Sequence, residues 1–425
     1  MSLYMSVTDR TPSSHLLTLL TITAFYLSAV YAVLLWSPNV LGKYFSRTVV
    51  TILFLLPWVM LWLLKGTEFI NDNKQRPELF LIMAIIALGI INVIFSDNPN
   101  KTYNAMRMFL LSGIMALWIS MFLLTNSRAV KTFDWFCCLC IAIIVPTEIL
   151  TYFSDSQANP NSITIFALNP IPLGTLLLLL SPGPVRLLMS GQKWPLTAGW
   201  ILTGLGLSLL LLTEKRGTFL ALIAIGCAWL FFKNSRLKLT LSILLILIAL
   251  IVPFKGLSYY RSLDQKNLSH LNILHRLELY PFGLHVYLKH PFFGIGLRPF
   301  THETYLSDYR IKQDLNLFTY MVKDLQTFDN MLLTALVELG SLMTLTYLAL
   351  IVLIVGKYWR KLQPLAQSPP LNLYRVLVLL GFAVHSMTYD SLLFPSVNWL
   401  FHVQLGILAG YTPATDTGLG LASSR

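Results

Sequence analysis

About twelve apolar stretches fill this chain, and one long polar segment, residues 255–329, interrupts them after the ninth. A helix needs about 20 apolar residues to cross the hydrocarbon core of a bilayer, and each stretch approaches that length. Lipid offers no hydrogen-bond partners, so a spanning helix must satisfy its backbone groups internally. The pattern predicts an all-α polytopic membrane protein with one long extramembrane loop. The predicted spans are residues 16–36, 48–64, 79–96, 107–125, 134–152, 162–181, 195–213, 216–232, 236–254, 330–356, 373–389 and 392–411.

The composition supports this class and argues against a soluble enzyme. Charged residues make up 12% of the chain, against about 25% in an ordinary soluble domain. The formal net charge is +12, which in a soluble protein would suggest nucleic acid as a partner. In a membrane protein the same excess arises because cytoplasmic loops collect Lys and Arg. We therefore expect membrane lipid, and no nucleic acid, among the partners.

The short loops also predict an orientation. If the N-terminus is cytoplasmic, the cytoplasmic loops hold more than twice as many Lys and Arg residues as the short outer loops. Both termini are therefore expected inside and the loop 255–329 outside. This gives three units: membrane helices in residues 1–254, the outer loop in 255–329, and membrane helices with a short cytoplasmic tail in 330–425.

The loop is not expected to fold as a separate domain, because some 75 residues without a cysteine pair form a marginal core. Short helices that pack over the membrane are expected instead, with Leu284, Phe292 and Phe318 resting on the spans or on a lipid chain. The four cysteines lie inside apolar stretches, which favours packing over disulfides or a zinc site.

Several residues near the loop attract attention. Lys215 and Arg216 form a tight turn on the predicted outer side, against the usual charge bias. Gly294 and Gly296 follow a proline and indicate a turn in which the backbone approaches another group closely. Asp329 or Asn330 is a natural N-cap for the next span. Glu338 lies inside that span, where an acid is costly and is expected to bond a partner near the site.

Three segments together resemble the bacterial O-antigen ligase and polymerase superfamily. Residues 213–217, TEKRG, are similar to its T-x-S-R-G element. Arg276 followed by HPFFGIGLRPF, residues 290–300, resembles its R…H-P-[LF]-x-G-x-G-x-x-x-F element. Residues 329–342, DNMLLTALVELGSL, are similar to its H-N-x-x-L-x-x-x-x-E-x-G helix start. The close resemblance covers roughly residues 195–345, in the expected order around the long loop.

The resemblance implies a glycosyltransferase in the bacterial inner membrane, with its active loop in the periplasm. Such enzymes move a glycan from undecaprenyl diphosphate to a hydroxyl group, so no nucleotide, cofactor or metal is expected. Arginine suits the leaving diphosphate, because its planar fork of donors matches phosphate oxygens. The resemblance assigns diphosphate binding to Lys215, Arg216, Arg276 and Arg298, with Arg216 and Arg276 catalytic. It makes Asn330, Glu338, Gly294 and Gly296 supporting residues.

The chain departs from the family at Asp329, where the family usually has histidine. A carboxylate can also accept the proton of the attacking hydroxyl, so Asp329 is the predicted base, with His302 and Glu303 as alternatives. The acceptor also stays open. Lipid A-core would make the protein an O-antigen ligase, and a second lipid-linked glycan would make it a polymerase; protein glycosylation is a third outcome. A transporter or flippase of lipid-linked sugars is the rival from another class.

Overall fold

The computed structural model describes residues 12–35, 47–73, 76–154, 170–190, 192–213, 216–233, 271–298, 305, 328–362 and 370–410. Within these residues the chain forms helices and no strand, which confirms the all-α class. Each predicted apolar stretch that falls on described residues is helical, whereas the stretch 236–254 lies outside them. The boundaries of the three predicted units remain a prediction.

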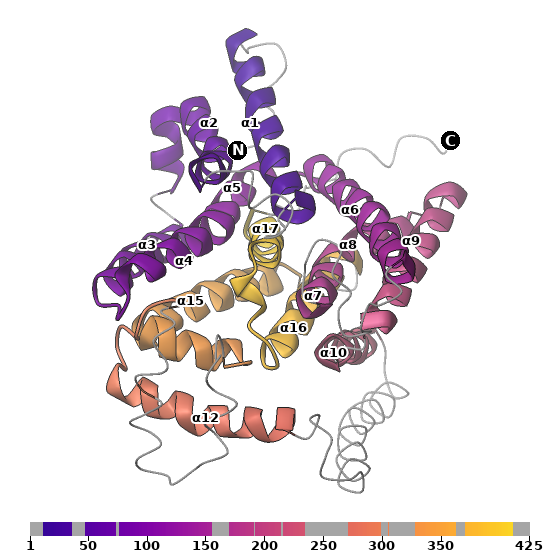
Figure 1. Ribbon diagram of the computed structural model, residues 1–425. Helices are drawn as coiled ribbons and strands as arrows, with labels where there is room; N and C mark the ends of the chain where they lie inside the picture. The colour runs from indigo at the N-terminus through magenta and orange to yellow at the C-terminus, as the bar shows by residue number, and fades with distance from the viewer. Residues whose placement is uncertain are drawn as a thin grey trace, which may run out of the picture.

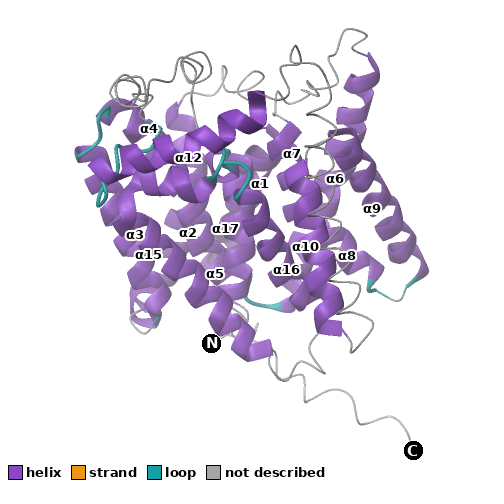
Figure 2. Cartoon of the chain, turned by 90° about the horizontal axis from the view of Figure 1, so that it is seen from below, coloured by secondary structure: helices purple, strands orange, loops and turns teal. Residues whose placement is uncertain are grey.

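Most of the helices stand side by side, and they run roughly upright in Figure 2. The main helices are α1 (Pro12–Val30), α2 (Arg47–Asn73), α3 (Pro77–Ile94), α4 (Pro99–Phe109), α5 (Met115–Leu123), α6 (Ser127–Ser154), α7 (Pro170–Leu180), α8 (Pro182–Leu188), α9 (Lys193–Thr213), α10 (Arg216–Lys233), α12 (Leu271–Lys289), α15 (Met331–Leu362), α16 (Pro370–Ser386) and α17 (Pro395–Gly410). A π-helical turn, Leu110–Ile114, joins α4 to α5, and a short 3-10 turn, Ser391–Leu393, precedes α17.

Five segments of the described chain are long and apolar enough to cross a membrane, which indicates a multi-pass membrane protein. Four shorter apolar helices accompany them. The predicted number of about twelve spans and the predicted orientation are not tested by these helices and stay predictions. The five segments are Leu16–Leu34, Pro77–Ile94, Pro99–Leu123, Ser127–Leu150 and Met331–Arg360, and the shorter helices are Thr48–Leu64, Pro172–Leu188, Gly217–Trp229 and Leu371–Ser386.

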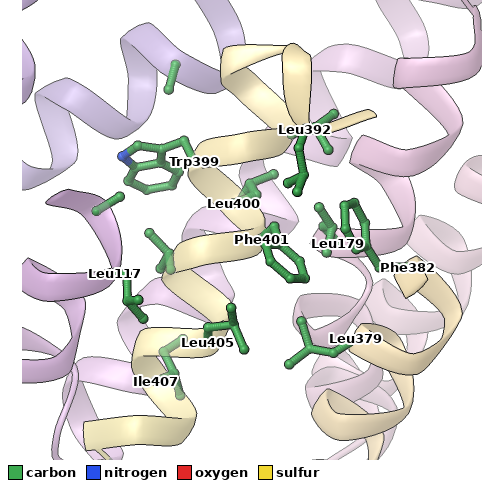
Figure 3. Packing of buried hydrophobic residues seen from close by; sticks show 14 of the residues in the cluster. Leu117, Leu179, Leu379, Phe382, Leu392, Trp399, Leu400, Phe401, Leu405 and Ile407 are labelled. Carbon is green, nitrogen blue, oxygen red and sulfur yellow. The ribbon is translucent and has the colours of Figure 1, made fainter. Parts of the chain in front are cut away.

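Helix α17 occupies the centre of the bundle (Figure 1). All of its residues except Ala409 are buried, and a helix that is enclosed on every side belongs to the core. Figure 3 shows its side chains between those of α5, α7 and α16, and Phe401 stacks on Phe382 with ring centroids 4.3 Å apart. Its polar residue Asn398 donates to the carbonyl of Phe109, at the start of the π-helical turn.

A buried cluster of charged and polar side chains connects five helices: α6, α7, α8, α16 and α17. Asp134 of α6 accepts hydrogen bonds from Arg186 of α8 and from Arg375 of α16. Arg375 also donates to Gln404 of α17 over 2.6 Å, and Gln404 donates to the carbonyl of Leu179 over 3.0 Å. Asp134 and Arg375 are each 1% exposed, so their charges are compensated by each other rather than by solvent.

Helix α12 is arranged differently from the rest. It runs across the bundle near one end (Figure 2) and lies at its edge beyond α15 (Figure 1). We call this end, where α12 and residues 290–298 lie, the loop end. One side of α12 packs on the first turns of α15 through a small apolar cluster, so the helix is fixed to the bundle rather than separate from it. The cluster consists of Leu279, Phe282, Val286, Ile295, Phe328 and Val337.

Candidate functional site at the loop end

Helix α15 is broken at Gly340, and the chain after α12 fills the break. Gly340 has φ 73° and ψ 173°, which no α-helix tolerates. The turn that begins at Pro291 supplies the missing backbone partners: Ser341 N–H donates to the Pro291 carbonyl over 2.8 Å, and Ile295 N–H donates to the Val337 carbonyl over 3.0 Å. A helix break at membrane depth is stable only where its freed groups are satisfied in this way. The turn and the break therefore form one structural unit.

Two predicted turn glycines lie at the closest approach of these segments. Gly294 has φ +69° and Gly296 has φ +100°, a region that favours glycine. A Cβ on Gly294 would lie 2.4 Å from the Glu338 carbonyl oxygen, and a Cβ on Gly296 would lie 2.0 Å from Ser96 Oγ. The sequence expectation of a turn with close backbone approach is thus met by this geometry.

Gly340 should be far less tolerant of substitution than Gly356, another glycine of the same helix. A Cβ at 340 would lie 2.3 Å from the Phe292 carbonyl oxygen, besides the strained φ, whereas a Cβ at Gly356 meets nothing within 4 Å. We expect Gly340→Ala to destabilise the protein by about 1–3 kcal/mol. Gly356→Ala should be neutral or slightly stabilising, by less than about 1 kcal/mol. Thermal unfolding of both variants in detergent measures the difference, and equal melting temperatures would contradict the packing described.

Residues of α3 and the segment after it complete this unit, and sequence reasoning missed them. Asn92 donates to the carbonyls of Phe293 (2.7 Å) and Glu338 (2.8 Å), so its amide joins the turn to α15. Ser96 Oγ lies 3.2 Å from the Ile295 carbonyl, to which it donates. An asparagine late in an otherwise apolar span was the signal in the sequence, because a buried amide needs partners.

The charged part of the site surrounds Arg298. Glu338 is fully buried, and its Oε2 accepts the backbone N–H of Arg298 over 2.9 Å. Burial lowers the pKa of the half-buried Arg298 guanidinium, and the nearby Glu338, Tyr389 and Asp390 oppose that shift. The sequence predicts that Glu338 bonds a partner near the site, and in the structure that partner is the backbone N–H of Arg298. Arg298 thus lies in the field of acidic groups, which offset part of its charge.

Asp390 is a further residue that sequence reasoning missed. It is 1% exposed and lies in the connection between α16 and α17, within electrostatic reach of Arg298 and Glu338. Two carboxylates and one guanidinium therefore gather from three segments far apart in the chain. The signal in the sequence was an acid in a short apolar connection, where ionised side chains are expensive.

Asn330 rather than Asp329 caps α15. Its Oδ1 accepts the N–H of Leu333 over 3.0 Å, the usual N-cap contact. Its Nδ2 lies 3.1 Å from Tyr280 Oη of α12 and 3.2 Å from the Met387 carbonyl after α16. Asp329 has φ 51°, a left-handed conformation that Asp and Asn adopt more readily than most residues. The pair Asp329–Asn330 therefore stands where α12, α15 and α16 meet.

The positions of both predicted catalytic arginines lie on elements that reach this junction. α10 begins at Arg216, and a Cβ on the next residue, Gly217, would lie 2.5 Å from Thr388 Oγ1, one residue after Met387. Arg276 lies in α12, one turn before Tyr280. The side chains of Arg216 and Arg276, and all of Lys215, His302 and Glu303, lie outside the described residues.

A buried histidine, His385, lies close to the same junction. His385 ring atoms lie 3.1 Å from Ser391 Oγ and 3.2–3.3 Å from Thr175 Oγ1, and the ring faces Gly217. These contacts connect α7 and α16 to the start of α10.

Comparison with protein families places part of the chain in a known family model. The family model described as O-antigen ligase matches residues 201–348, from α9 into α15, and this match confirms the resemblance. Each site residue predicted from the sequence lies within the matched segment, whereas Asn92 and Asp390 lie outside it. Among curated proteins, none matches this chain.

Proposed function

Residues 201–348, which contain the predicted site residues, match the O-antigen ligase family model, and we propose on this basis that the membrane protein is a glycosyltransferase. It would transfer a glycan from an undecaprenyl-diphosphate carrier to a hydroxyl acceptor. Lipid A-core is the proposed acceptor, which makes the protein an O-antigen ligase at the outer face of the bacterial inner membrane. The observation that carries the proposal is the junction at Asn330. Its amide contacts Tyr280 of α12, the helix that holds Arg276, and the Met387 carbonyl, next to the Thr388 side chain that faces Gly217 at the start of α10.

The donor is proposed from the chemistry of its leaving group. A departing diphosphate gains negative charge in the transition state, and donors held in place near a low-dielectric edge stabilise that charge strongly. Arg216 and Arg276 would contact it, with Lys215 and Arg298 in support. The activated bond is already present in the lipid-linked donor, so the reaction consumes no nucleotide. The outer-face orientation rests on the charge bias of the loops.

Asp329 is proposed as the group that accepts the proton of the attacking hydroxyl. General-base catalysis of this kind contributes about 10²–10⁴ in rate. Asp329→Asn is a clean test, because asparagine tolerates the left-handed backbone as well as aspartate does and leaves the Asn330 cap unchanged. We expect the variant to lose at least 10²-fold in transfer rate.

The alternative bases provide the comparison for this test. His302→Ala and Glu303→Gln should retain most of the activity if Asp329 is the base. Near-normal transfer by Asp329→Asn, together with loss in either of the other variants, would move the base to residue 302 or 303.

The function itself is tested with purified protein in liposomes. Lipid-linked glycan and lipid A-core are supplied without nucleotide, and formation of the joined product supports transfer. Movement of the donor across the bilayer without any product would support a transporter or flippase instead.

The acceptor is tested in the native host. Deletion of the gene should remove all long glycan chains from lipid A-core on a polysaccharide gel. A single repeat unit left on the core would instead identify a polymerase.

A further inference from the structure

Helix α12 has three different sides, and one of them is an exposed apolar stripe. Its buried side packs on α15 through Leu279, Phe282 and Val286. Tyr280, Leu284 and Leu288 recur every four residues on the next side, and they are 44%, 52% and 66% exposed. We call these three residues the α12 stripe. Lys289, one position further on, is exposed and polar, and His285 on the same side is partly buried. Leu284 is half exposed, so of the two contacts expected for it, the spans or a lipid chain, the lipid contact stays a prediction.

This division is what a helix at a membrane surface requires. A helix in water would expose polar residues on both free sides, whereas an interfacial helix turns one free side toward acyl chains and the other toward water. Tyrosine at the edge of the stripe suits the boundary, because its ring is apolar and its hydroxyl is polar. Here that hydroxyl already accepts a hydrogen bond from Asn330.

The stripe is continuous with apolar surface on the membrane-length helices. Phe292, 63% exposed, follows the C-terminal end of α12, and its carbonyl accepts the N–H of Leu342. From Leu342 the exposed apolar residues continue along α15 through Leu345 to Val352. Beside them, Phe293 stacks on the exposed Phe95, which directly follows α3, with ring centroids 5.0 Å apart. Because α3 and α15 each contain a segment long enough to span a bilayer, their exposed apolar sides are suited to contact lipid, and Phe292 connects α12 to that part of α15.

We propose that α12 is an interfacial helix whose stripe, Tyr280, Leu284 and Leu288, contacts the acyl chains of bilayer phospholipids at the loop end. The helix would then fix the depth of the site relative to the membrane surface. Arg276, one turn before Tyr280, would be held near the level of lipid phosphates, where a lipid-linked diphosphate also resides. This consequence rests on the proposed function, but the lipid contact itself does not.

The test measures the surroundings of single side chains in phospholipid liposomes that contain no glycan donor. Leu284→Cys and Leu288→Cys carry a nitroxide label, and its relaxation by oxygen, which collects in lipid, is compared with relaxation by a water-soluble nickel chelate. Val352→Cys serves as the lipid-facing reference and Asn100→Cys, in an exposed position at the start of α4, as the aqueous reference. The unmodified chain measures background labelling, because its four cysteines are buried.

We expect both stripe labels to show an oxygen-to-nickel relaxation ratio well above that of the label at 100 and near that of the label at 352. A ratio like that of position 100 would mean that the stripe faces water and would overturn the proposal. Low relaxation by both reagents would mean that protein covers the stripe, and this too would overturn it. The measurement involves no glycan, so its outcome is independent of whether the proposed transfer activity is correct.

Discussion

Replacing Arg216 or Arg276 with alanine is expected to lower the rate of glycan transfer by about 10²–10³-fold, the usual loss when one donor to a developing anion is removed. α12, which holds Arg276, contacts Asn330 through Tyr280, and α10 begins at Arg216 beside Thr388, one residue after the Met387 carbonyl that Asn330 also contacts. Both arginines are proposed to bind a single diphosphate. Lysine should rescue poorly at either position, because its ammonium lacks the fork that binds two phosphate oxygens.

If the two arginines share one diphosphate, their effects should not multiply. We expect the double alanine variant to lose less than the product of the two single losses, because residues that act as a unit are non-additive. Transfer is measured with purified variants at matched protein amounts. Arg128→Ala, an exposed residue in the first turn of α6, is the control and should retain full activity. Full activity in both single alanine variants would remove the catalytic role proposed for the arginines.

The second large effect concerns stability rather than chemistry. Asp134→Ala should destabilise the protein by about 3–5 kcal/mol, because it leaves Arg375 buried without its carboxylate partner. Arg186 also loses its partner, but its side chain is 26% exposed and can turn toward solvent or lipid headgroups. The expected result is a large fall in the melting temperature in detergent and a low yield of folded protein.

Two comparisons separate this effect from a general loss of charge. Glu78→Gln breaks another interhelical pair, with Lys357 at 2.5 Å, but the lysine side chain is 42% exposed. Loss of this ion pair should therefore lower the free energy of unfolding by less than about 1 kcal/mol. Asp134→Leu combined with Arg375→Leu removes both buried charges and should recover much of the stability. An Asp134→Ala variant as stable as Glu78→Gln would show that the cluster contributes little.

The helical part of the fold could be predicted because lipid leaves few alternatives. A run of about 20 apolar residues must be a helix in a bilayer, so the helices over described residues coincide with the expected stretches. The break in α15 could not be predicted in the same way. Gly340 lies inside an otherwise continuous apolar stretch, and the break is stabilised by the docking of residues 291–298, some 45 positions earlier, and by Asn92 of α3.

The candidate site was predictable where a local motif carries it and not where distant segments meet. Gly294, Gly296 and the Asp329–Asn330 pair stood out because turn and cap chemistry is local. Asn92 and Asp390 did not, since their importance comes from partners about 200 and 50 residues away, respectively, at Phe293 and Glu338. The choice between Asp329 and Asn330 as cap also needed the structure, because either side chain can accept the N–H of Leu333.

The complete enclosure of α17 has a consequence for biogenesis. This helix carries Asn398, His402 and Gln404, whose partners belong to helices made earlier in translation. Polar side chains of this kind are costly against acyl chains, so the segment is poorly suited to enter the bilayer alone. Because α17 follows the other described helices in the chain, we expect it to insert last, between helices that are already made. A chain truncated before residue 395 would therefore lack the buried central helix, and the helices that pack on α17 would expose their inner side chains.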